Sequence, residues 1–189
     1  MAFFSLRLWK LRPIMDGLCE RFRKVYSPSQ DICIDESLFK YRGRFMWRTY
    51  NRSKRARYGL KAYKLCESSG DATGFTLAMR MYLGDDQEGD TPVAERIVML
   101  LMKEAGCLDK FHHVYMDRWY SSPSLFHKLQ ARGCAAIGTV DKRRKHLPIE
   151  IKNLKKMTKG EVIRRSSPGG MLALAWMDKN LVSYTLYLF

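Results

Sequence analysis

Residues 31–39, DICIDESLF, alternate apolar and polar side chains, and this stretch decides the fold. Ile32 and Ile34 fall on one side of an extended chain, whereas Asp35 falls on the other. A repeat of two residues is the period of a β-strand with one face buried. The stretch therefore predicts a strand that carries an acidic side chain beside its buried residues.

Regular elements are predicted on both sides of this strand. Upstream, apolar residues at three-to-four spacing between Leu6 and Tyr26 predict an amphipathic helix. Downstream, a helix is predicted from Thr91, as its N-cap, to Ala105 with Gly106 as its stop, and a second from Ser122 to residue 132. Further strands are predicted at 60–66, 75–83, 114–117, 134–140, 171–177 and 181–188, and a long loop over 142–165.

This order of elements predicts an α/β fold (α+β mixed sheet). Three consecutive antiparallel strands are followed by alternating strands and helices, which gives an RNase H-like, five-stranded mixed sheet with flanking helices. Residues 1–30 are expected to form a helical lead-in and residues 31–189 the sheet domain. In this topology the first strand and the strand at 114–117 are neighbours at the middle of the sheet.

The composition excludes several classes of protein. The 189 residues include 34 Lys and Arg against 19 Asp and Glu, which gives a net charge of +15, and 46% are hydrophobic. Plentiful apolar residues exclude a disordered chain, and the longest apolar run is far too short to span a membrane. Five dispersed cysteines without a Cys-x-x-Cys pair argue against a disulfide framework or a zinc site, and favour a reducing compartment.

Two basic segments contain most of the excess positive charge. Residues 37–66 hold ten Lys and Arg and no acid, and residues 142–165 hold ten more with only Glu150 and Glu161. The charge bias favours a polyanion partner, and the aromatic residues interleaved in the first segment suit phosphate contact combined with base or sugar packing. The alternatives are a solvated face and, for the first segment, a half-buried strand. The candidate DNA-binding residues are Arg42, Arg44, Arg48, Arg52, Lys54, Arg55, Arg57, Lys142, Arg143, Arg144 and Lys145.

Two acids stand at the predicted central strands. Asp35 lies within the first strand, and Asp117 ends the strand at 114–117. Two carboxylates that converge at the edge of a sheet can hold divalent cations for phosphoryl transfer, and Mg²⁺ prefers such oxygen ligands. The alternative is that Asp35 caps a local turn and that Asp117 caps the segment after it.

Several ordered motifs resemble a known family. They are RPIMDGLCERFRKVYSPSQ, IDESLFKYRGR, RYGLKAYKLCESSG, VYMDRWYSS and GTVDKRRKHLP. From about Lys10 to Tyr187 the chain resembles the catalytic domain of piggyBac-type transposases and the piggyBac transposable element-derived proteins. The resemblance implies an RNase H-like domain that cleaves and joins DNA with three aspartates and Mg²⁺. It matches Asp35 and Asp117 to the first and second catalytic, metal-binding aspartates.

The third aspartate of that family lies in a downstream Gly-Val-Asp-type segment, and nothing in this chain matches it. Asp178 occupies a turn that is not the family's catalytic position. The chain stops at LVSYTLYLF, an apolar strand, so we expect a fragment, with residues 31–189 a partial catalytic domain truncated at the C-terminus.

Two functions from different classes follow from the resemblance. The first is a transposase-derived remnant that binds DNA and is inactive alone because the third acid is missing. The alternative is an active Mg²⁺-dependent DNA transposase or nuclease, if the chain is part of a longer product. A nuclear location and a possible homodimer are also implied, and neither a membrane nor a small-molecule substrate is expected.

Overall fold

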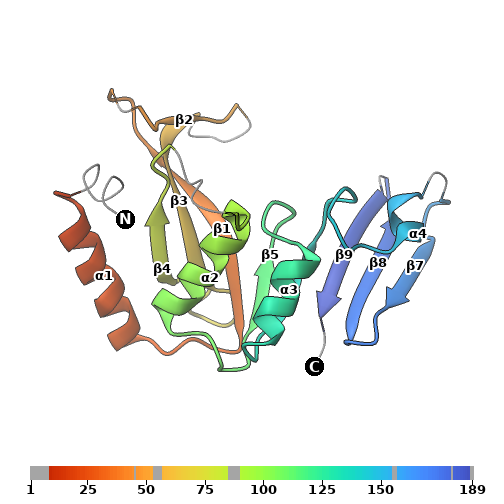
Figure 1. Ribbon diagram of the computed structural model, residues 1–189. Helices are drawn as coiled ribbons and strands as arrows, with labels where there is room; N and C mark the ends of the chain where they lie inside the picture. The colour runs from red at the N-terminus through yellow and green to blue at the C-terminus, as the bar shows by residue number, and fades with distance from the viewer. Residues whose placement is uncertain are drawn as a thin grey trace. The chain divides into compact units, whose positions relative to one another are not determined.

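The computed structural model describes residues 9–44, 46–52, 57–84, 90–154, 157–179 and 181–187. The chain divides into two compact units. Unit one comprises residues 1–29 and 34–106, and unit two comprises residues 30–33 and 107–189. The long strand β1 (Asp31–Lys40) therefore begins in unit two and continues into unit one (Figure 1).

Unit one is a small antiparallel sheet with two helices. Besides most of β1 it contains α1 (Arg12–Val25), β2 (Thr49–Tyr50), β3 (Tyr58–Glu67), β4 (Thr76–Met81) and α2 (Val93–Ala105). Strand β1 neighbours β3, and both β2 and β4 pair with β3 in antiparallel register. Figure 1 shows α1 beside β4. The hairpin predicted around residues 66–75 is confirmed.

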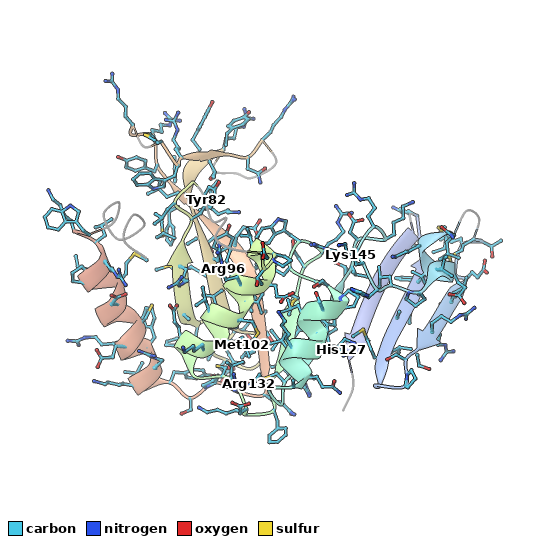
Figure 2. All side chains as sticks on the ribbon, in the orientation of Figure 1. Tyr82, Arg96, Met102, His127, Arg132 and Lys145 are labelled. Atoms are coloured by element: carbon cyan, nitrogen blue, oxygen red, sulfur yellow. The ribbon has the colours of Figure 1, made fainter. Side chains whose placement is uncertain are left out.

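The core of unit one forms where α2 packs on the sheet. Ile34 of β1 and Leu65 of β3 are buried, as are Leu101 and Met102 of α2. Figure 2 labels Met102 on this helix. Apolar residues three and four apart on α2 therefore face the alternating apolar residues of the strands, and this burial supplies most of the stabilisation.

The ends of α2 test two predictions. Gly106 ends the helix with a φ of 66°, as predicted, because a residue without a side chain adopts the left-handed conformation without strain. The predicted N-cap was wrong. Pro92 takes the N-cap position with extended backbone, the helix begins at Val93, and no side chain caps it. The proline fixes the start of the helix one residue later than Thr91 would.

A buried carboxylate ties the segment after α1 to the turn between β3 and β4. Glu67 is fully buried. Its oxygens accept hydrogen bonds from the Tyr26 hydroxyl at 3.0 Å, the Ser29 amide at 2.8 Å and the Ser29 hydroxyl at 2.5 Å. Burial raises the pKa of Glu67, but the hydrogen bonds from Ser29 and Tyr26 outweigh burial and lower the pKa to about 2. A buried charge is tolerated only when it is bonded in this way.

Unit two is a second sheet, with helices of its own. After the start of β1 it contains β5 (His113–Met116), α3 (Pro123–Gln130), β6 (Ala135–Thr139), α4 (Ile149–Lys152), β7 (Val162–Ser166), β8 (Met171–Met177) and β9 (Leu181–Tyr187). The strands follow the order β1-β5-β6-β9-β8-β7, with β5 parallel to β6 and the pairs β6–β9, β9–β8 and β8–β7 antiparallel. The mixed sheet with flanking helices is as predicted.

The number of strands differs from the prediction. The described chain has nine strands rather than five, and the predicted loop over 142–165 contains α4 and β7. Strand β7 is an exposed edge strand that pairs with β8, for example Arg164 with Leu174. Its short polar sequence carries no alternation of buried residues, so only the pairing with β8 makes it a strand.

Three contacts join the start of β1 to β5 within unit two. The His113 amide donates to the Gln30 carbonyl at 2.7 Å, and the Asp31 carboxylate lies 3.0 Å from His113 Nδ1 and 3.2 Å from the Tyr115 hydroxyl. These contacts place Asp31 beside His113.

No helix in the described part of the chain is long and apolar enough to cross a membrane.

The Glu67 network generates the first prediction. Glu67→Gln removes the charge to which Tyr26, Ser29, Ser68 and Ser69 donate, and we expect the free energy of unfolding to fall by about 1–3 kcal/mol. Because the pKa is lower in the folded chain, this stabilisation is complete above about pH 5 and is lost as the pH falls toward 2. Denaturant unfolding of the whole chain at several pH values measures both effects.

Glu104→Gln is the matched control. Glu104 forms an exposed ion pair with Arg80, with Nη2 and Oε1 2.9 Å apart, and exposed pairs contribute less than about 1 kcal/mol. Equal losses for the two variants would contradict the role given to Glu67.

Candidate nucleic-acid interface and acidic residues

Asp35 lies on β1 in unit one, directly after the buried Ile34. The alternation of the strand turns its side chain away from the core, and the residue is exposed. Its Oδ1 atom accepts a hydrogen bond from the amide of Glu36 at 2.7 Å. Asp35 is therefore a solvent-exposed carboxylate on a strand. Glu36, which the sequence analysis did not single out, places a further acid beside it.

Asp117 follows the last residue of β5 in unit two and is also exposed. Its Oδ1 atom accepts hydrogen bonds from the amides of Trp119 at 2.9 Å and Tyr120 at 3.4 Å. Asp117 thus caps the turn after β5, which is the local role considered as the alternative. Within the described residues no donor reaches Oδ2, so this oxygen remains available to a ligand.

Close packing fixes the turn that presents Asp117. The Ser121 hydroxyl, which is buried, donates to the Asp117 carbonyl at 2.8 Å. On the neighbouring strand β6, Gly138 leaves room for this turn: a Cβ atom there would lie far inside contact distance of the Met116 carbonyl and the Ser121 hydroxyl. A glycine is required at this position because the backbones approach too closely for any side chain.

A pocket of about 540 Å³ opens beside Asp117 within unit two. It is lined by Asp117, Arg118, Trp119, Asp141, Arg143 and Arg144. The strands β5 and β6 are parallel, so their carboxyl ends meet at one edge of the sheet, and the segments that follow them form the pocket. Figure 2 shows Lys145, on the segment after β6, near the end of α3 at which that helix starts.

The two arginines after β6 have different surroundings. Arg143 pairs with Asp141 through two contacts, Nε to Oδ1 at 3.0 Å and Nη2 to Oδ2 at 2.8 Å. The hydrogen bonds from Arg143 hold the pKa of Asp141 well below its usual range. Arg144 instead donates from Nη2 to the Trp119 carbonyl at 2.6 Å. Asp141 neutralises one of the predicted DNA-binding cations and was not among the site residues predicted from the sequence.

The first basic segment lies around β2 and the start of β3 in unit one. Arg48 donates from Nη1 to the carbonyls of Arg42 and Gly43, both at 3.3 Å, and its guanidinium lies 4.9 Å from the ring centre of Tyr58. The ring of Tyr50 lies 4.8 Å from that of Tyr58. These contacts hold a basic and aromatic surface in a fixed conformation.

The remaining predicted cations have these positions. Arg42, Arg44, Arg52 and Arg57 are exposed in unit one, and Lys142 and Lys145 are exposed in unit two. Lys54 and Arg55 lie outside the described residues. We name the exposed set Arg42, Arg44, Arg52 and Arg57 the arginine surface. Within the part of the chain that the structure describes, none of these four guanidinium groups forms an ion pair with a carboxylate.

Comparison with known proteins identifies the family. The family model described as Transposase IS4 matches residues 6–189. The human PiggyBac transposable element-derived protein 3 is 26% identical over 182 residues, which cover 92% of this chain and 30% of that protein. The human Chimeric ERCC6-PGBD3 protein is also 26% identical over 182 residues, with 92% and 17% covered.

A solved structure shows the same fold. It is the cryo-EM structure of a piggyBac transposase synaptic complex with hairpin DNA, with a TM-score of 0.83 and 24% sequence identity. The match covers 98% of this chain and 40% of that one, so the chain spans less than half the length of the relatives it matches. This chain belongs to the Transposase IS4 family, and its sequence and its fold are similar to those of the piggyBac transposases and the proteins derived from them.

Proposed function

We propose that this transposase-derived chain binds double-stranded DNA through its two basic segments. The observation that carries the proposal is the arginine surface, whose four exposed guanidinium groups lack a carboxylate partner among the described residues. Arginine donates to phosphate oxygens in a planar, bidentate geometry, and neutralising phosphates supplies most of the affinity for duplex DNA. The net charge of +15 adds attraction at longer range.

The relatives support the same substrate class. The solved piggyBac transposase contains hairpin DNA. The resemblance also implies a nuclear location, because a transposase acts on chromosomal DNA. It implies a homodimer as well, and both belong to this proposal. DNA binding by the present chain requires only its own surface, and this part of the proposal is tested without a partner.

We propose further that Asp35 and Asp117 hold a divalent cation. In unit two Asp31 contacts His113; Asp35 comes four residues after Asp31 in the sequence, and Asp117 comes four residues after His113. Side chains four residues apart on a strand share one face, which supports the placement of both carboxylates on the same face.

The donor set fits magnesium. Both acids are exposed carboxylates, Asp117 keeps Oδ2 available, and Glu36 offers a further carboxylate oxygen. Mg²⁺ prefers oxygen ligands and retains several waters, so few protein ligands are needed. When bound, such a cation lowers the pKa of an attacking water or hydroxyl and stabilises the oxygen that leaves.

The same acids limit what the chain does alone. The resemblance assigns catalysis to three aspartates, and no residue of this sequence matches the third. We infer that the chain binds DNA without cleaving it. The alternative, a Mg²⁺-dependent transposase or nuclease, is supported by the two exposed aspartates and applies if these residues act within a longer product.

Salt dependence tests DNA binding. We expect the affinity for duplex DNA to fall steeply with salt, because counterions are released when phosphates are neutralised. Substituting Arg42→Gln with Arg44→Gln should weaken binding and reduce the slope of log K against log salt by about 1 for each phosphate that an arginine no longer neutralises. Fluorescence anisotropy with a labelled duplex measures both.

A matched variant controls for net charge. Arg80→Gln with Arg132→Gln also removes two positive charges, but these arginines pair with Glu104 and Asp109. We expect this variant to bind nearly as the unaltered chain does. An affinity for duplex DNA that does not change with salt concentration would refute the arginine surface as the DNA-binding site. An equal weakening of binding in the two variants would refute it as well.

Cleavage tests the catalytic inference. Supercoiled plasmid incubated with the chain and Mg²⁺ or Mn²⁺ should remain supercoiled, because the acidic set lacks one member. Gel electrophoresis over time measures nicking, with Asp35→Asn and Asp117→Asn as paired controls. Nicking by the unaltered chain that both variants abolish would replace the remnant with the active enzyme.

A further inference from the structure

The pocket beside Asp117 has an unequal balance of charge. Arg143 neutralises Asp141. The amide of Arg143 donates to the Asp141 carboxylate at 2.9 Å, and the Arg143 guanidinium donates to the same carboxylate. Arg118 is exposed and has no hydrogen bond or ion pair with the described residues. Arg118 and Arg144 therefore face a single unneutralised carboxylate, that of Asp117, and the pocket favours an anion.

Arg144 has a buried donor, Nε, that lacks an acceptor among the described residues. Its Nη2 atom donates to the Trp119 carbonyl, but its Nε atom is buried and no described residue accepts from it. A buried donor without an acceptor is unfavourable, and most such donors in proteins are satisfied. An anionic oxygen that entered the pocket would accept from this guanidinium in a charge-assisted hydrogen bond.

Trp119 supplies a fixed aromatic surface in the same pocket. Its backbone is held at both ends, by its amide to Asp117 Oδ1 and by its carbonyl to Arg144 Nη2. The buried Tyr120 packs edge-on against the indole ring, with ring centres 4.7 Å apart. Trp119 nevertheless keeps 41% of its surface exposed. A large ring held in this way is a platform for stacking.

We propose that this pocket binds one unpaired nucleotide of a DNA strand, with its base stacked on Trp119 and its phosphate held by Arg118 and Arg144. A base inside a duplex has both faces covered, so it cannot stack on a side chain until it leaves the helix. The volume of about 540 Å³ is within the range of pockets that hold small organic groups. This inference rests on the proposed DNA binding and adds a preference for frayed or single-stranded ends.

The test compares two DNA molecules. One is a blunt duplex, and the other is the same duplex with a short single-stranded extension at its 3′ or 5′ end. We expect the chain to bind one of the extended duplexes about tenfold more tightly, because a gain of this order corresponds to the free energy of stacking one base on an aromatic side chain. An extension of abasic residues, with the same phosphates but no bases, should bind like the blunt duplex.

Variants of the chain locate the effect. Trp119→Ala should remove the preference and leave affinity for the blunt duplex unchanged, whereas Trp119→Phe should retain part of it. Trp176→Ala is the matched control, because Trp176 is 38% exposed on β8 and does not line the pocket. It should leave the preference intact. Near-ultraviolet circular dichroism confirms that each variant is folded.

The outcomes separate this inference from the function on which it rests. Blunt-duplex binding without any preference, or a preference that survives Trp119→Ala, overturns the nucleotide pocket and leaves DNA binding in place. Failure to bind either DNA overturns both.

Discussion

The hydrogen bond from the His113 amide to the Gln30 carbonyl is the interaction on which the proposed chemistry depends. Together with the contacts of Asp31 to His113 and Tyr115, it joins the start of β1 to β5 within unit two. A shift of one residue would turn every side chain of a strand to the other face. The buried Ile32 and Val114 oppose such a shift, since each would move from the core to water. In the proposed cation site, Asp35 follows Asp31 by four residues and Asp117 follows His113 by four, so the proposal depends on these contacts.

The positive charge of the chain is not uniformly available. Arg143 and Arg132 are bound to Asp141 and Asp109, and Arg80 is bound to Glu104. The arginine surface, in contrast, has no such partner among the described residues. In the proposed function, net charge attracts DNA at a distance, while the arginine surface decides where it is held. Near Asp117 the same distinction separates Arg143, which is neutralised, from Arg118 and Arg144, and this difference makes the pocket selective for an anion.

Local patterns predicted the parts of the fold that depend on neighbours in sequence. The alternation around Ile32 and Ile34 predicts β1, and Ser122 caps α3 as expected, with the Leu125 amide 3.2 Å from its hydroxyl. Interactions between distant segments were missed. The bonds of Glu67 to Tyr26 and Ser29 join residues about forty positions apart, and β7 is a strand only because β8 pairs with it. The pairing of Asp141 with Arg143 is local, and the Asp-x-Arg spacing in a basic turn was the signal that could have revealed it.

The central proposal is that Asp35 and Asp117 hold one divalent cation together, which requires their side chains to meet. An engineered crosslink tests it most directly, because a disulfide forms only when two Cα atoms are about 4.4–6.8 Å apart. In the double variant Asp35→Cys with Asp117→Cys, mild oxidation followed by peptide mass spectrometry should find the two new cysteines joined to each other. Efficient crosslinking of either one to Cys33 or another native cysteine instead, or no crosslink in a folded variant, would contradict the proposed cation site.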